Sequence, residues 1–111
     1  MNVMERLQKQ VDENPVVIYM KGTPTFPQCG FSMRTSQALA ACGEEFLAVN
    51  IFEDAEVYQS LKQFSNWPTF PQVYIGGQFV GGCDITLDLF ERGELQQMVK
   101  DAVAAGKQAG E

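Results

Sequence analysis

Apolar residues recur with two different periods along the first half of the chain. At residues 2–13 they are three and four apart, which predicts an amphipathic helix that ends at the following Asn-Pro pair. An uninterrupted, β-branched apolar run at residues 16–20 is typical of a strand buried on both faces. A loop with two prolines at 22–28 leads to a second helical pattern at 29–42 and a second strand at 46–51. These segments predict a strand–helix–strand unit.

The second half continues with helical and strand patterns in turn. Residues 54–64 predict a helix that an aspartate can cap. Residues 72–80 predict a hairpin, because their central glycine pair supplies the positive φ that a two-residue turn requires. Residues 84–92 and 94–104 predict two short helices or one interrupted helix. The order α-β-α-β-α-β-β-α indicates an α/β fold, with a four-stranded mixed sheet flanked by helices.

Length and charge narrow the class of protein. A chain of 111 residues fits one domain, predicted at 1–105, with 106–111 as a flexible tail because residues 104–111 lack an apolar period. The net charge of -6, from 14 acidic and 8 basic residues, argues against a nucleic-acid partner. No apolar run approaches the roughly 20 residues that span a bilayer, so no membrane is expected. The amino-terminal residues do not resemble a signal peptide, which predicts a cytoplasmic protein.

Few side chains are available for chemistry. The chain has three cysteines, and an odd number in a reducing compartment does not indicate a disulfide framework. It has no histidine, which excludes Cys–His and Ser–His pairs and any zinc site with histidine ligands. Any chemistry must therefore use thiols, carboxylates, Lys or Arg side chains, or the backbone.

Cys29 is the most informative of these positions. It follows a strand and a proline-bearing loop and opens a predicted helix, where backbone N–H groups and the helix dipole favour a thiolate. Lys21, at the end of the preceding strand, can add positive charge at the same place. The alternative is a small apolar residue buried under the loop. The helix start and the nearby cation favour the reactive thiol.

The residues after Cys29 limit its redox partners. In the run CGFS at 29–32, Ser32 stands where a Cys-x-x-Cys site carries its second thiol, so no disulfide can cross that turn. A disulfide of Cys29 must form with another molecule, with Cys42 or with Cys83. Cys42 is expected in the core, since free cysteine is among the most buried residue types. For Cys83, packing and resolution of a Cys29 adduct both stay open.

Four separated motifs occur in one order. They are Lys21, CGFS at 29–32, WPTFPQ at 67–72 and GGCD at 81–84. Together they resemble the monothiol glutaredoxins of the CGFS type, in particular the single-domain bacterial members, over roughly residues 3–100. The resemblance implies a thioredoxin-like fold, a glutaredoxin domain, glutathione as ligand, and a [2Fe–2S] cluster carried in iron–sulfur cluster assembly and iron homeostasis.

The resemblance also implies a glutathione site. Lys21 would meet the glycyl carboxylate, and a cis bond before Pro71 would free the Thr69 backbone to pair with the peptide. The helix start after Gly82 would hold the γ-glutamyl end, with Asp84 either on its ammonium group or as a helix cap. The predicted glutathione-binding residues are Lys21, Gly30, Phe31, Tyr58, Lys62, Thr69, Phe70, Pro71, Gly82, Cys83 and Asp84.

Three aromatic residues of this region have individual expectations. Tyr58 stands where many relatives carry an arginine, which predicts weaker anchoring of the glycyl carboxylate unless Lys62 compensates. Phe31 is expected to form a pocket wall, because it opens the helix on the exposed side. Trp67 is expected in the core.

Two functions are compatible with these residues. The resemblance implies a cluster bridging a homodimer through two Cys29 thiolates and two glutathiones, with a monomeric apo form, BolA-like partners in heterodimers and iron–sulfur recipient proteins. The alternative is a glutathione-dependent protein-disulfide oxidoreductase that uses Cys29 as its sole nucleophile, with weak activity expected. A redox-inert adaptor would leave the combination of Lys21, Thr69 and Asp84 unexplained.

Overall fold

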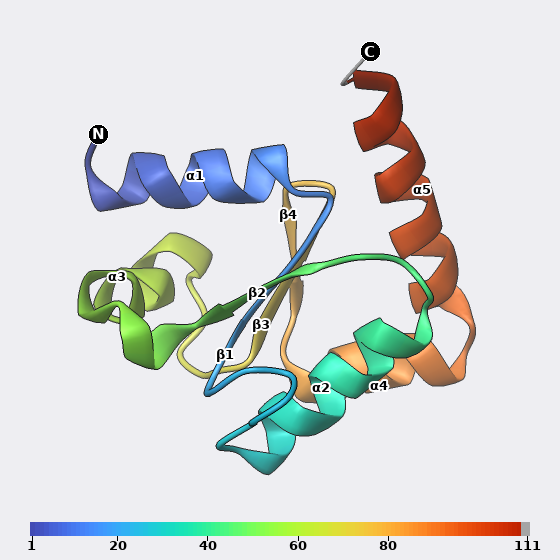
Figure 1. Ribbon diagram of the computed structural model, residues 1–111, viewed down its shortest axis with the longest axis horizontal. Helices are drawn as coiled ribbons and strands as arrows, with labels where there is room; N and C mark the ends of the chain where they lie inside the picture. Colours follow the sequence, from blue (N-terminus) through green and yellow to red (C-terminus); the bar gives the residue numbers. More distant parts are fainter. Residues whose placement is uncertain (110–111) are drawn as a thin grey trace.

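The computed structural model describes residues 1–109 and confirms the predicted order of elements, with one added 3-10 turn (Figure 1). The helices and strands are α1 (Val3–Glu13), β1 (Val16–Met20), α2 (Gly30–Ala41), β2 (Leu47–Asn50), η1 (Ile51–Glu53), α3 (Ala55–Ser65), β3 (Gln72–Ile75), β4 (Gln78–Gly81), α4 (Cys83–Glu91) and α5 (Glu94–Ala109). In the described part of the chain, no helix has both the length and the apolar character to cross a membrane.

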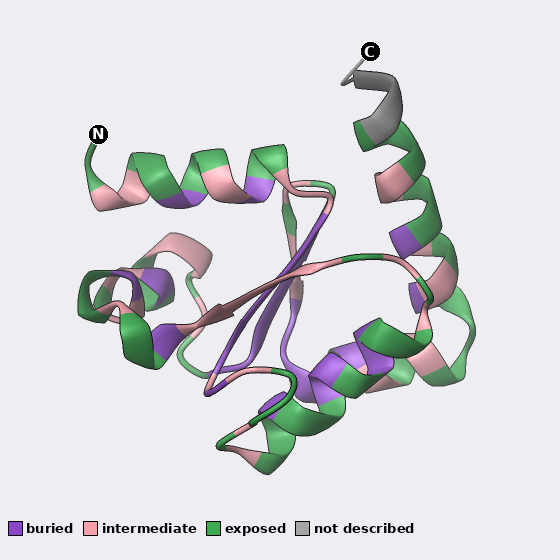
Figure 2. Ribbon diagram, in the orientation of Figure 1, coloured by how far each residue is buried: buried purple, intermediate pink, exposed green. Residues whose placement is uncertain are grey.

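The four strands form one mixed sheet in the order β2-β1-β3-β4. β1 runs parallel to β2 and antiparallel to β3, and β3 and β4 form the predicted hairpin. Ile18 illustrates the central place of β1, because it pairs with Ala48 on one side and Val73 on the other. All five residues of β1 are buried, as expected for a strand covered on both faces (Figure 2).

Side chains of β1 alternate between two hydrophobic cores. Val17 and Tyr19 pack with α1 and α3 on one face of the sheet, whereas Ile18 and Met20 pack with α2, α4 and α5 on the other (Figure 1). This period of two is the pleat of an extended strand. Each fully buried aliphatic side chain contributes roughly 1.5–3 kcal/mol relative to an exposed one, so β1 anchors both layers.

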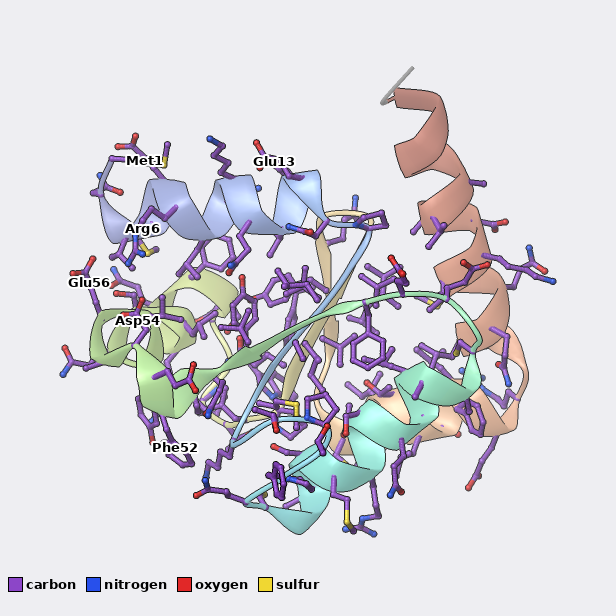
Figure 3. The ribbon with its side chains drawn as sticks, viewed as in Figure 1. Met1, Arg6, Glu13, Phe52, Asp54 and Glu56 are labelled. Carbon is purple, nitrogen blue, oxygen red and sulfur yellow. The ribbon has the colours of Figure 1, made fainter. Side chains whose placement is uncertain are left out.

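Polar contacts join α1 to the start of α3. Asp54 caps α3, because its Oδ1 accepts the backbone N–H groups of Glu56 and Val57, both at 3.1 Å. Arg6 of α1 lies between the two acidic side chains, 3.6 Å from Asp54 and 3.5 Å from Glu56, and Figure 3 shows these three residues facing one another. The carboxylate at the cap therefore serves both the helix end and the helix–helix contact.

Substituting the cap separates these two contributions. Asp54→Ala is expected to lower the free energy of unfolding by about 1 kcal/mol, because two N–H groups of the first turn lose their acceptor. Asp54→Asn keeps an acceptor oxygen and removes only the charge facing Arg6, and an exposed ion pair contributes at most about 1 kcal/mol and usually less. Urea unfolding measures both variants. Equal losses would show that the ion pair, and not the cap, is responsible.

Most element boundaries lie within one residue of the sequence prediction, and the largest difference is at the end of α5. α5 continues to Ala109, so the helix end predicted at residue 104 is too early. The last turns consist mainly of good helix formers, and Gly106 lies against the ring of Pro15, where an added Cβ would be 2.9 Å from the ring. The flexible tail predicted for 106–111 stays a prediction, and its last two residues lie outside the described part. The second strand is one residue shorter at each end, and it stops at Asn50 because the side chain of Asn50 caps the 3-10 turn that begins at Ile51.

Candidate functional site

A pocket of about 550 Å³ opens beside Cys29, at the end of the sheet where β1 meets the start of α2. It is lined by Lys21, Cys29, Phe31, Tyr58, Lys62, Trp67, Pro68, Thr69, Phe70, Pro71, Gly82, Cys83, Asp84 and Ile85. Every predicted glutathione-binding residue except Gly30 is among them. Gly30 is exposed, with open space where a side chain would be. Segments more than 50 positions apart in sequence therefore converge at Cys29.

Cys29 occupies the N-cap position of α2. Its backbone is extended and its carbonyl accepts the N–H of Met33 at 2.9 Å. The pKa of its thiol is lowered chiefly by the backbone N–H of Ser32, and further by the N–H of Phe31, the charge of Lys21 and the hydroxyl of Ser32. Burial opposes this shift, because a half-buried thiolate loses some hydration. The thiolate is therefore stabilised relative to that of an ordinary cysteine, which is the direction expected for a helix start beside a lysine.

Ser32 has a role that sequence reasoning missed. Its side chain is fully buried, and its Oγ accepts the backbone N–H of Lys21 at 3.0 Å. This bond joins the end of β1 to the first turn of α2 and so places Lys21 near Cys29. From the sequence alone, Ser32 is notable only because it replaces a second thiol. The sequence did contain a signal for this role, because a serine in the first turn of a helix commonly forms a hydrogen bond with a backbone group.

Ser32→Ala is expected to raise the pKa of Cys29, because the thiolate loses a hydroxyl donor and Lys21 loses its link to α2. The pH dependence of alkylation at Cys29, followed by mass spectrometry of its peptide, measures this shift. Ser36→Ala is the matched control, since Ser36 is also buried on α2 but donates to the carbonyl of Met33. An unchanged alkylation profile in Ser32→Ala would contradict this role.

The loop before β3 forms one wall of the pocket. The predicted cis bond between Phe70 and Pro71 is confirmed. Gln72 is fully buried and donates its amide to the carbonyls of Trp67, at 3.2 Å, and Thr69, at 3.3 Å. The N–H of Thr69 has no hydrogen-bond partner among residues 1–109, so it is available to an extended peptide. Gln72 thus fixes a backbone edge at the pocket.

The start of α4 lines the pocket beside this loop, because an added Cβ at Gly82 would lie 3.3 Å from the carbonyl oxygen of Pro71. Gly82 takes the N-cap position, so the alternative that Asp84 caps this helix is wrong. No side chain within the described residues caps α4, which leaves its first N–H groups for an anion. Asp84 itself is exposed in the first turn and lines the pocket. A carboxylate and a set of backbone donors therefore lie side by side.

The other residues with individual expectations lie either at the pocket or against the core. Trp67, predicted in the core, is only half-buried and lines the pocket, with its indole Nε1 unpartnered among the described residues. Phe31 is 53% exposed and lines the pocket as predicted. Cys42 is half-buried against the second core, where burial raises the pKa of its thiol. Cys83 is 8% exposed and lines the same pocket as Cys29.

Comparison of the sequence with known proteins identifies the family of this chain. The sequence profile of the Glutaredoxin family matches residues 16–80, more than half of the chain. The chain belongs to the glutaredoxin family. Glutaredoxin 4 of Escherichia coli K12 is 49% identical to it over 104 residues, covering 94% of this chain and 90% of that glutaredoxin.

Solved glutaredoxin structures agree with the fold. The solution structure of reduced poplar apo GrxS14 matches with a TM-score of 0.77 at 49% identity, covering 90% of this chain and 92% of that one. The crystal structure of a buckwheat glutaredoxin–glutathione complex matches with a TM-score of 0.79 at 25% identity, covering 91% and 90%. The predicted monothiol glutaredoxin family and thioredoxin-like fold are therefore confirmed.

Proposed function

We propose that this glutaredoxin binds glutathione beside Cys29 and, as a homodimer, carries a [2Fe–2S] cluster for transfer to iron–sulfur recipient proteins. The observation that carries the proposal is the composition of the pocket around a thiol whose pKa is lowered by neighbouring N–H groups and Lys21. The role would lie in iron–sulfur cluster assembly and iron homeostasis in the cytoplasm, with BolA-like proteins as further partners.

Charge in the pocket supports glutathione as the ligand. Glutathione carries two carboxylates and one ammonium group, and the pocket offers two ammonium groups, on Lys21 and Lys62, and one carboxylate, on Asp84. The lysines would hold the glycyl end. Asp84 and the first N–H groups of α4 would hold the γ-glutamyl end, and the free N–H of Thr69 would pair with the peptide backbone between them.

The positions of the cysteines support a shared cluster. A [2Fe–2S] cluster takes four ligands, usually thiolates. Cys42 and Cys29 flank the 12-residue helix α2, which is about 18 Å long, so both cannot bind one cluster. In the described part of the chain, no three Cys, His, Asp or Glu side chains group as a metal site. Two subunits would instead supply two Cys29 thiolates, and two bound glutathiones would supply the other two.

Anaerobic reconstitution with iron, sulfide and glutathione tests this function. Size-exclusion chromatography with absorbance detection should show a colourless apo monomer convert to a coloured dimer with charge-transfer absorption. A chain that stays a colourless monomer under these conditions would contradict cluster carriage.

Reduction of glutathionylated proteins is the second candidate, favoured by the lowered pKa of Cys29. The Cys29 thiolate would attack the glutathione sulfur of a mixed disulfide and expel the protein thiolate, and a second glutathione would then release Cys29. We expect this activity to be weak, because the loop at residues 23–27, closed by the bond from the Thr23 N–H to the Phe26 carbonyl, leads to Cys29 and would reposition glutathione. Brisk glutathione-dependent disulfide reduction by the colourless monomer would favour the enzyme.

A further inference from the structure

Three aromatic rings form a continuous row from the core to the surface beside the pocket. Phe70, only 7% exposed, lies 5.4 Å from Tyr58 between ring centroids. Tyr58 lines the pocket, and Phe52 stacks on it with a centroid separation of 6.2 Å and an interplanar angle of 25°. Phe52 is 52% exposed, so the row ends in a ring with a free face. Figure 3 shows Phe52 projecting from η1 on the side away from α1.

The side chain of Asn50 fixes the backbone at Phe52 through hydrogen bonds. The N–H of Phe52 donates to Oδ1 of Asn50 at 3.0 Å, and the same oxygen accepts the N–H of Gly22 at 3.1 Å. Asn50 thereby joins η1 to the loop that carries Cys29. The backbone at Phe52 is thus fixed, and the stack on Tyr58 holds the ring, before any ligand arrives, which reduces the entropic cost of a contact with it.

A cation lies beside the same row. The ammonium nitrogen of Lys62 is 6.0 Å from the ring centroid of Tyr58, and both residues line the pocket. A carboxylate bound by Lys62 would therefore lie next to an aromatic face. The glycyl residue of glutathione has no side chain to cover that face, whereas an aromatic amino acid carries a carboxylate and a ring together.

We propose that Tyr58 and Phe52 form a subsite for an aromatic side chain on the residue that follows cysteine in a γ-glutamyl-cysteinyl peptide thiol. The proposal rests on the proposed glutathione site, since it places the carboxyl-terminal end of the peptide at Lys62. Stacked or tilted aromatic pairs add binding beyond the area they bury. The subsite accordingly prefers an aromatic third residue over a small one.

Binding of three reduced peptides, γ-Glu-Cys-Gly, γ-Glu-Cys-Ala and γ-Glu-Cys-Phe, tests this preference by calorimetric titration of the whole chain. The alanine peptide is the matched reference, because it has the same backbone and stereocentre without a ring. The phenylalanine peptide is expected to bind about threefold to tenfold more tightly than the alanine peptide. This ratio of affinities should fall close to unity in Phe52→Ala and in Tyr58→Leu, and should be restored in Phe52→Tyr.

Met33→Ala is the control variant, because Met33 is an exposed apolar residue of α2 that does not line the pocket. It should keep the ratio of the unsubstituted protein. A ratio near unity in the unsubstituted protein, or one that survives Phe52→Ala, would overturn the subsite while glutathione binding stands. Failure of γ-Glu-Cys-Gly to bind at all would overturn the proposed function and the subsite with it.

Discussion

Replacing Cys29 by serine is expected to abolish the coloured dimer and leave a monomer with absorbance at the background level. The thiolate at the N-cap of α2 is stabilised by two backbone N–H groups, a lysine and a hydroxyl, and a serine hydroxyl in that place stays protonated. The substitution removes one ligand from each subunit, and so half of the proposed set. Anaerobic reconstitution followed by absorbance and size-exclusion chromatography measures the loss.

Two controls accompany this variant. Cys42→Ser removes a thiol from the far end of the same helix and should leave colour and dimer unchanged. Glutathione should still bind to Cys29→Ser, because the proposed contacts of the peptide are noncovalent and involve Lys21, Lys62 and Asp84. A coloured dimer that survives Cys29→Ser, or one lost in Cys42→Ser, would show that the ligand is misassigned.

The second large effect is expected at the loop that leads to Cys29. Gly22 has a φ of +90°, and an added Cβ would lie 2.5 Å from the carbonyl oxygen of Phe26 and 2.8 Å from the nitrogen of Gln28. Gly22→Ala therefore forces the backbone apart and strains two loop hydrogen bonds, Thr23 N–H to Phe26 and Gln28 N–H to Lys21. We expect a loss of about 3–4 kcal/mol in the free energy of unfolding, the sum of backbone strain and lost bonds.

Gly43→Ala provides the matched control for this prediction. Gly43 also has a positive φ, +82°, but an added Cβ would have nothing within 4 Å. Its substitution should cost only the left-handed backbone penalty, about 1–2 kcal/mol. Urea unfolding of both variants gives the difference. Equal losses would show that the close approach at Gly22 does not matter to stability.

The elements that sequence predicted well are those whose signal is local. The apolar run that became β1 is long and β-branched, and the Gly76-Gly77 pair adopts the positive φ values that its hairpin needs. Asp54 caps α3 as predicted. The turn η1 could not be predicted in this way, because it depends on the side chain of Asn50, which accepts the N–H of Phe52 within the turn and the N–H of Gly22 from a distant loop.

The candidate site shows the same division. Most residues of the site could be predicted, because four motifs in one order resemble the monothiol glutaredoxins. The contacts between these residues could not be predicted. Ser32 connects β1 to α2, and Trp67 lines the pocket together with the rest of the loop before β3. Phe52 gave no signal of its own, since it matters only through its stack on Tyr58. Such roles come from packing between segments distant in sequence.

The most direct test of the central claim is reconstitution with and without glutathione, with the bound peptide counted after gel filtration. Because the pocket beside Cys29 has charges that match those of glutathione, bound glutathione would act as a ligand of the cluster. The expected result is a coloured dimer that retains one glutathione for each Cys29 and does not form when glutathione is omitted. A cluster that assembles equally well without glutathione would contradict this account.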